Sequence, residues 1–108
     1  MPRDDAARIN DILEACERIQ VHIHGMNALQ FAASETVLRA VLYDIAIIGE
    51  AAKGVSDAGR LARPAVPWAK MAGMRDIVIH QYFGIDKALT WQAASVEVVT
   101  LLRALRGA

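Results

Sequence analysis

The spacing of apolar residues constrains this chain most, because it follows the repeat of an α-helix along the whole sequence. Apolar side chains recur at steps of three and four, and no segment alternates with the period of two that marks a strand. The pattern predicts main helices over about residues 4–24, 35–55, 67–83 and 86–105, with a short helix over 28–33. We therefore expect an all-α fold, an antiparallel bundle of four main helices plus a short helix.

Single residues indicate where these helices begin and end. Gly25 is expected to stop the first main helix, Ser34 to cap the second, Pro67 to begin the third and Asp86 to cap the last. Gly73 lies inside the third predicted helix, where glycine costs about 0.5–1 kcal/mol relative to alanine. We therefore expect another backbone to approach closely at Gly73.

Length and composition predict one domain that pairs with a second copy. The 108 residues are enough for one compact core and too few for two, so a single domain is expected over residues 1–108. Hydrophobic residues make up 55% of the chain. Exchanging tyrosine for glycine in that count raises the share further above the roughly 45–50% typical of soluble domains. Because so small a domain has little interior, we expect apolar surface in a homodimer interface.

Two features of the sequence bear on the cellular compartment in which the protein is expected. A lone cysteine, Cys16, has no internal partner for a disulfide, which favours the reducing cytoplasm. The N-terminal sequence lacks the apolar core of a signal peptide, and the most hydrophobic run is interrupted by Asp44, Glu50 and Lys53. We expect a cytoplasmic protein without a membrane segment.

Polar residues form a second pattern on the helix predicted over 35–55. Arg39, Tyr43, Glu50 and Lys53 line up there at helical spacing, apart from the apolar face. Such a stripe could line a cleft, although a solvated face is the commoner explanation.

The stretch MRDIVIHQYFGID, residues 74–86, concentrates reactive side chains in an otherwise apolar segment. Arg75, His80 and Tyr82 fall within eight residues of one another. On an ideal helix, Arg75 and His80 point about 140° apart, whereas Asp76 and His80 share a face. Arg75 and His80 can reach one substrate if the long arginine wraps around the helix, or if two copies of the helix meet. The expected dimer favours the second arrangement.

These residue types suit phosphodiester cleavage that needs no metal ion and no other cofactor. A histidine can take the proton from a ribose 2′-hydroxyl or give one to the leaving oxygen. A guanidinium can hold two phosphate oxygens while charge builds on them. RNA supplies that internal nucleophile and DNA does not. Asp76 could orient the His80 imidazole or raise its pKa, and Tyr82 could position a phosphate or stack on a base.

Basic residues precede this stretch without an acid among them. The formal net charge is zero, which argues against a protein that coats nucleic acid through its overall field. The segment SDAGRLARPAVP, residues 56–67, is expected to be the one sizeable loop. With Lys70 just beyond it, its arginines make Arg60, Arg63 and Lys70 candidate RNA contacts, although a merely solvated loop fits the charge pattern equally well.

Three quoted segments together resemble one known family. PWAKMAGMRDIVIHQYFGID, residues 67–86, followed by Trp91, resembles the HepT-like branch of the HEPN superfamily. The signature of that branch is an arginine, four to six residues and a histidine, commonly extended by x-Tyr. IGEAAKGVSD, residues 48–57, and ARINDILEACERIQ, residues 7–20, are similar to two further segments of the family. The resemblance covers nearly the whole chain.

The resemblance implies a function and its partners. It implies a homodimer with a metal-independent endoribonuclease cleft at the dimer interface, acting as the toxin of a toxin–antitoxin pair. The antitoxin would be an MNT-type nucleotidyltransferase. Carried over to this chain, Arg75 and His80 become the catalytic pair, and Tyr82 the tyrosine to which the antitoxin transfers AMP. Asp76 departs from the family motif, which often has asparagine there, so the added negative charge would lie beside the phosphate site.

Two other hypotheses stay open. The chain could be a catalytically weak dimer that binds a nucleotidyltransferase or a nucleotide in the same cleft. Alternatively, Arg75, Asp76 and His80 could form a buried polar network that fixes the register of the dimer. No metal site is expected: His22 and His24 point about 200° apart on a helix and do not form a pair of ligands.

Overall fold

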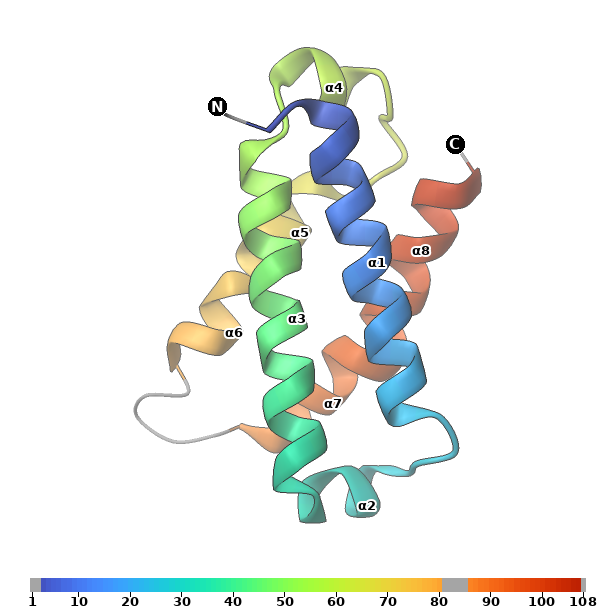
Figure 1. Cartoon of the computed structure of the whole chain (residues 1–108), viewed down its shortest axis with the longest axis vertical. Coiled ribbons are helices and arrows are strands. Elements are labelled where there is room, and N and C mark those ends of the chain that lie inside the picture. The colour runs from blue at the N-terminus through green and yellow to red at the C-terminus, as the bar shows by residue number, and fades with distance from the viewer. Residues whose placement is uncertain (1–2, 81–85, 108) are drawn as a thin grey trace.

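A computed structural model describes residues 3–80 and 86–107 of the chain, with the backbone alone for residues 78–80. These residues form helices and no strand, which confirms the all-α prediction (Figure 1). In chain order the elements are α1 (Asp5–Ile23), α2 (Ala28–Ala33), α3 (Glu35–Gly54), α4 (Asp57–Leu61), α5 (Trp68–Gly73), α6 (Arg75–His80), α7 (Lys87–Gln92), the π-helical segment η2 (Ala93–Glu97) and α8 (Val98–Gly107).

Neighbouring residues determine where the two longest helices begin and where α1 ends. The Asp4 carboxylate accepts a hydrogen bond from the N–H of Ala7 at 2.7 Å and caps α1, and Gly25 follows that helix with φ of +75°. That left-handed conformation carries no penalty for glycine, so the predicted stop is confirmed. The Ser34 hydroxyl accepts a hydrogen bond from the N–H of Val37 at 3.3 Å, which confirms the predicted cap of α3.

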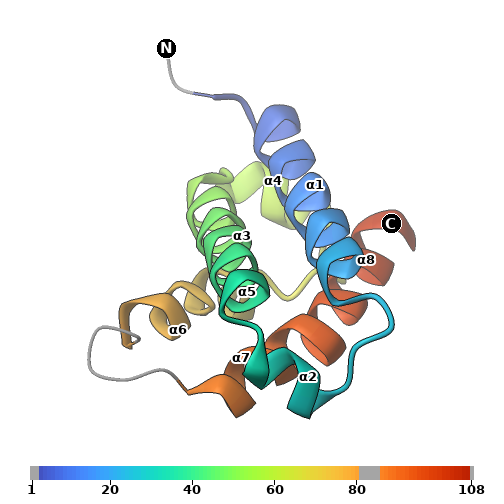
Figure 2. The same cartoon turned by 60° about the horizontal axis from the view of Figure 1, so that its bottom comes forward.

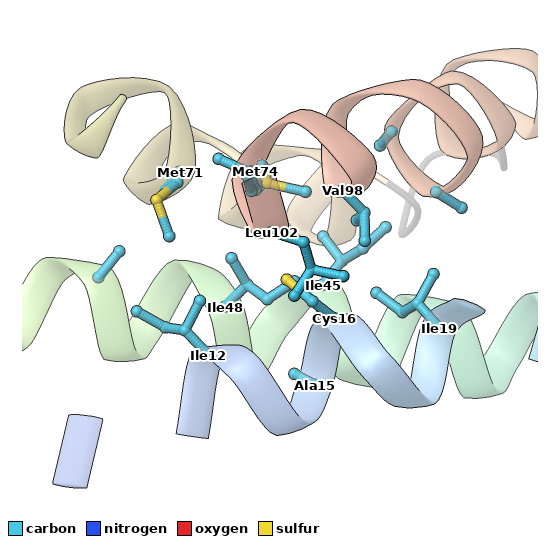
Figure 3. Packing of buried hydrophobic residues seen from close by; sticks show 14 of the residues in the cluster. Ile12, Ala15, Cys16, Ile19, Ile45, Ile48, Met71, Met74, Val98 and Leu102 are labelled. Carbon is cyan, nitrogen blue, oxygen red and sulfur yellow. The ribbon is translucent and has the colours of Figure 1, made fainter. Parts of the chain in front are cut away.

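Helix α3 is the central element of the bundle. It packs against α1, α5 and α6, and both views show α1 on one side of α3 and α6 on the other (Figures 1 and 2). Apolar side chains from α1, α3, α5 and α8 meet in one interior (Figure 3). The largest fully buried side chains are Phe31, Ile12, Ile19, Leu38, Ile45, Ile48, Met71, Leu101, Leu102, Val41, Val98 and Thr90.

One charged contact joins α1 and α3 beside this interior. Asp44 is only 2% exposed, and its Oδ1 lies 2.9 Å from both Nε and Nη2 of Arg18. A carboxylate so deeply buried requires a partner that compensates its charge. The Arg18–Asp44 ion pair therefore belongs to the packing of α3 against α1.

A second contact links the start of α1 to the start of α4. The Ser56 side chain caps α4, and Ser56 donates both its N–H and its hydroxyl to the Asp5 carboxylate, the N–H at 2.9 Å from Oδ1. The hydrogen bond from the Ser56 side chain is the main reason that the pKa of Asp5 is lowered. The expectation of a plain loop over 56–67 was therefore wrong, because a short capped helix lies inside it.

The third predicted helix is divided in two. Helix α5 ends at Gly73 and α6 begins at Arg75, because the N–H of Met74 turns to the carbonyl of Met71, three residues back, at 3.1 Å. Pro67 precedes α5 as its flanking residue instead of opening the helix. The prediction of one continuous helix from Pro67 was therefore wrong over its described part.

The expected close approach at Gly73 is also wrong. A Cβ added to Gly73 would meet no described atom within 4 Å. The close approach occurs at Gly49 of α3, where a Cβ would lie 3.0 Å from the backbone N of Arg75. Both glycines lie in helical segments, and only the folding of α6 onto α3 distinguishes them.

The last predicted helix contains a π-helical turn. Asp86 caps it as predicted, accepting a hydrogen bond from the N–H of Leu89 at 2.9 Å. The segment η2 then widens one turn, so the following residues leave the 3.6-residue repeat. Leu89 and Val96 are exposed, whereas Thr90 and Val98 are buried.

Within the described part of the chain, no helix has both the length and the apolar character to cross a membrane.

Candidate active site

Arg75 is the first residue of α6. Helix α6 lies on the side of α3 that faces away from α1 (Figure 2). Gly49 of α3 lies directly under it: an added Cβ would come within 3.0 Å of the N and Cβ of Arg75 and 3.3 Å of its Cα. Ordinary contacts of a Cβ are longer, at 3.4–4 Å. Because Gly49 carries a hydrogen atom where other residues carry a Cβ, the start of α6 can lie against α3.

The residue after Gly49 contacts the other end of the same arginine. Oε1 of Glu50 lies 2.9 Å from Nε of Arg75, and the two side chains are 58% and 45% exposed. Both are therefore within reach of a ligand from solvent. Glu50 belongs to the predicted polar stripe of α3, whose members Arg39, Tyr43 and Lys53 are exposed as well.

The rest of the predicted site is described only in part. Asp76 is exposed and lies in the first turn of α6, where an acidic side chain interacts favourably with the helix dipole. The backbone is helical from Arg75 to His80, as expected, so Asp76 and His80 are one turn apart. The side chain of His80 and the whole of Tyr82 lie outside the described residues. Their placement relative to Arg75 stays a prediction.

The candidate RNA contacts Arg60 and Arg63 have partners within the chain. Nη2 of Arg60 donates to the carbonyls of Ala52 and Lys53, both at 3.2 Å, at the end of α3. Nη1 of Arg63 donates to the carbonyl of Leu105 at 3.1 Å, near the end of α8. Helix C-termini present unpaired carbonyls and a partial negative charge, so these arginines act as caps.

Lys70, the third candidate, pairs with the segment that contains the π-helical turn. Its Nζ lies 3.3 Å from Oε1 of Glu97, while the lysine side chain stays 61% exposed. This pair lines a pocket between α5 and the last three helical segments, together with Pro67, Met74 and Gln92. A role for Lys70 in RNA binding stays a prediction.

Sequence reasoning did not identify Gly49 and Glu50 as parts of the site. Both belong to the segment IGEAAKGVSD, and Glu50 also lies on the polar stripe, so a signal was present. The missing information was their partner: Arg75 follows Glu50 by 25 residues (75 − 50), and no local spacing connects them. The described residues contain no group of three or more His, Cys, Asp or Glu that could hold a metal ion.

Comparisons with known proteins find similarity to a ribonuclease family and to several proteins named as ribonucleases. A family model described as Ribonuclease HepT-like matches residues 12–107. "Probable ribonuclease HepT" of Thermococcus cleftensis is 33% identical over 101 residues, which cover 94% of this chain and 92% of that protein. "Putative RNase MJ1380" of Methanocaldococcus jannaschii is 35% identical over 96 residues, 89% of this chain and 88% of that protein. "Putative RNase TTE0752" of Caldanaerobacter subterraneus is 33% identical over 93 residues, 86% and 83% of the two chains. No solved structure matches the chain.

Proposed function

Because the chain belongs to the Ribonuclease HepT-like family, we propose that it is an endoribonuclease that cleaves RNA without a metal ion. One structural observation supports this proposal: an exposed guanidinium, that of Arg75, begins the helix that carries His80. A phosphate can approach Arg75 from solvent while the same short helix supplies the proton-transfer group.

The proposed reaction uses the ribose as the nucleophile. His80 takes the proton of the 2′-hydroxyl, the 2′-oxygen attacks phosphorus, and the 5′-oxygen of the next nucleotide leaves and takes up a proton. The products are a 2′,3′-cyclic phosphate and a 5′-hydroxyl. Arg75 stabilises the charge that builds on the phosphate oxygens. We propose that two copies of α6 meet in a homodimer, so that the two residue types, about 140° apart on one ideal helix, converge on one phosphate.

The test is cleavage of end-labelled single-stranded RNA by the purified chain in EDTA. We expect products with a 2′,3′-cyclic phosphate, and no cleavage of a matched strand with 2′-deoxy sugars. Arg75→Ala and His80→Ala should abolish cleavage while the far-UV circular dichroism keeps its helical signal. Cutting of the 2′-deoxy strand, or a metal requirement, would contradict the mechanism.

We also propose that the chain is the toxin of a pair with an MNT-type nucleotidyltransferase that transfers AMP to Tyr82. The family membership supports this pairing, and Tyr82 follows His80 at the spacing of the motif. The test is co-expression with the product of the neighbouring gene, followed by mass spectrometry of the toxin. We expect one adenylyl group on the wild-type chain and none on Tyr82→Phe.

The charge around Arg75 favours a second candidate function. Glu50 lies against the guanidinium and Asp76 is the next residue along α6, so two acids accompany one arginine. Such a balance weakens attraction for RNA and suits a module that binds a nucleotidyltransferase partner or a nucleotide without turning RNA over. Stable partner binding without any RNA cleavage between about pH 5 and pH 8, the range in which a histidine titrates, would support this second function.

A further inference from the structure

Two consecutive residues of α3 hold the two ends of Arg75. Gly49 lies against its backbone N and Cβ, and Glu50 lies 2.9 Å from Nε of its guanidinium. Helix α3 therefore fixes both where this side chain starts and where its charged end lies. We call this pair of contacts the Gly49–Glu50 platform.

The ion pair in the platform differs from an ordinary surface pair. Glu35 and Arg39 are also paired, at 2.6 Å, but they are one turn apart on the same helix and their side chains are 71% and 75% exposed. Neighbours of that kind meet through local spacing alone and contribute little. Glu50 and Arg75 come from different helices, and their contact depends on the packing of α6 on α3.

The ion pair leaves Arg75 able to bind a phosphate. A guanidinium has five N–H donors, whereas one carboxylate has two oxygens, so Arg75 keeps donors for a second anion. Its side chain is 45% exposed, so that anion can approach from solvent. Holding Nε would restrict the rotation of the guanidinium and set the direction of the remaining donors.

We propose that Glu50 is a positioning residue for RNA cleavage that acts through Arg75. This inference rests on the proposed ribonuclease function. Glu50 orients the guanidinium for the transition state, and its own negative charge repels the RNA backbone. The two effects have opposite signs: the carboxylate speeds cleavage of bound RNA and weakens RNA binding.

Because the two effects have opposite signs, separate measurements of cleavage rate and RNA affinity distinguish a positioning role from a purely structural one. We would measure the single-turnover cleavage rate at saturating RNA for Glu50→Gln and Glu50→Ala. RNA affinity would be measured for the same changes in a His80→Ala background, in which no cleavage is expected. For Glu50→Ala we expect a rate about tenfold to a hundredfold lower, the loss typical of a misplaced catalytic group. We expect affinity to rise about threefold, as for one exposed charge removed beside a phosphate. The cleavage rate of Glu50→Gln should fall between those of Glu50→Ala and the wild type, since its amide oxygen can still accept a hydrogen bond. Its RNA affinity should rise as much as that of Glu50→Ala, because both variants lose the charge.

The matched control for Glu50→Gln is Glu35→Gln, which likewise removes one negative charge from the same helix and turns an ion pair with arginine into an uncharged contact. It should change neither the cleavage rate nor the RNA affinity. Urea unfolding of every variant shows whether the folded fraction is preserved.

Each other outcome has a defined meaning. If the wild type cleaves RNA, His80→Ala does not, and Glu50→Ala cleaves as fast as the wild type, the positioning role is wrong and the ribonuclease proposal stands. If Glu50→Ala loses affinity and rate together with stability, the carboxylate is structural and the inference is overturned. If the wild type does not cleave RNA, both proposals fail.

Discussion

Replacing Gly49 with alanine tests whether the separation of α3 and α6 matters for stability and activity. The new Cβ would lie 3.0 Å from both N and Cβ of Arg75, against a lower limit of 3.4 Å for ordinary contact. The start of α6 must therefore shift by a few tenths of an ångström, about 0.4 Å (3.4 − 3.0) to reach that limit. Because two of the close atoms are the backbone N and Cα, rotation of the arginine side chain cannot relieve the contact.

Two opposing terms set the expected change in the free energy of unfolding. Alanine in a helix interior is favoured over glycine by about 0.5–1 kcal/mol, whereas overpacking a closely packed site costs about 1–3 kcal/mol. The balance is a destabilisation of about 1 kcal/mol, with a range of about 0–2.5 kcal/mol. With a urea slope of about 1–3 kcal/mol per molar, the unfolding midpoint should fall by roughly 0.5 M.

The assay is urea unfolding followed by circular dichroism, with the RNA cleavage rate of the same preparation measured in EDTA. Cleavage should slow by about tenfold or more, because displacement of the start of α6 moves Arg75. Gly73→Ala is the matched control, since its Cβ would meet no atom of the described residues within 4 Å, and it should unfold at the wild-type midpoint or slightly above it. A Gly49→Ala variant as stable and as active as Gly73→Ala would refute the reasoning.

Three further predictions concern residues away from Arg75. Arg18→Ala should lower the free energy of unfolding by about 2–3 kcal/mol, because it leaves the buried carboxylate of Asp44 unpaired. A loss below about 0.5 kcal/mol, measured by urea unfolding, would contradict this prediction. Hydrogen bonds from Ser56 lower the pKa of Asp5 in the folded chain below its value of about 4 in the unfolded chain. The stabilisation that they give is therefore complete above the unfolded pKa, and it is lost as the pH falls through the folded pKa. The difference in unfolding midpoint between wild type and Asp5→Asn should therefore shrink in acid, and a difference that grows in acid would show the wrong sign. Burial raises the pKa of Cys16 to about 12. A disulfide reagent at about pH 8 should therefore label this thiol in urea but not in the native protein, and rapid labelling of the native protein would contradict this prediction.

The helices that could be predicted from the sequence are those whose limits depend on neighbouring residues. Ser34 caps α3, Gly25 follows α1 in the left-handed conformation and Asp86 caps α7, each through local geometry. The division at Met74 and the π-helical turn could not be predicted in this way. Both change how a helix packs on its neighbours, and a repeat of 3.6 residues contains no information on such changes.

Packing partners were the main information that the sequence lacked. Gly49 and Gly73 each interrupt a predicted helix, and only the position of α6 shows which of them another backbone approaches. The charge pattern likewise located Arg60 and Arg63, but it did not show that their guanidinium groups cap the ends of α3 and α8.

For the site, the sequence located the helix with Arg75 and Asp76, and the structure adds the residue that faces the arginine. Glu50 was expected on an exposed polar stripe, and it is exposed, but its contact with Arg75 is tertiary. The roles of His80 and Tyr82 stay predictions, since the placement of these side chains lies outside the described residues.

The contacts that hold Arg75 are encoded by two adjacent codons, far from the codons of the motif itself. In the genetic code, every glutamate codon becomes a glutamine codon by a single nucleotide change. One nucleotide change can therefore remove the charge of Glu50, and with it the ion pair to the guanidinium, while the arginine and the histidine of the motif are unchanged. Genome surveys that count a chain as an intact nuclease from its motif alone will overlook such attenuated alleles unless they also read the position of Glu50.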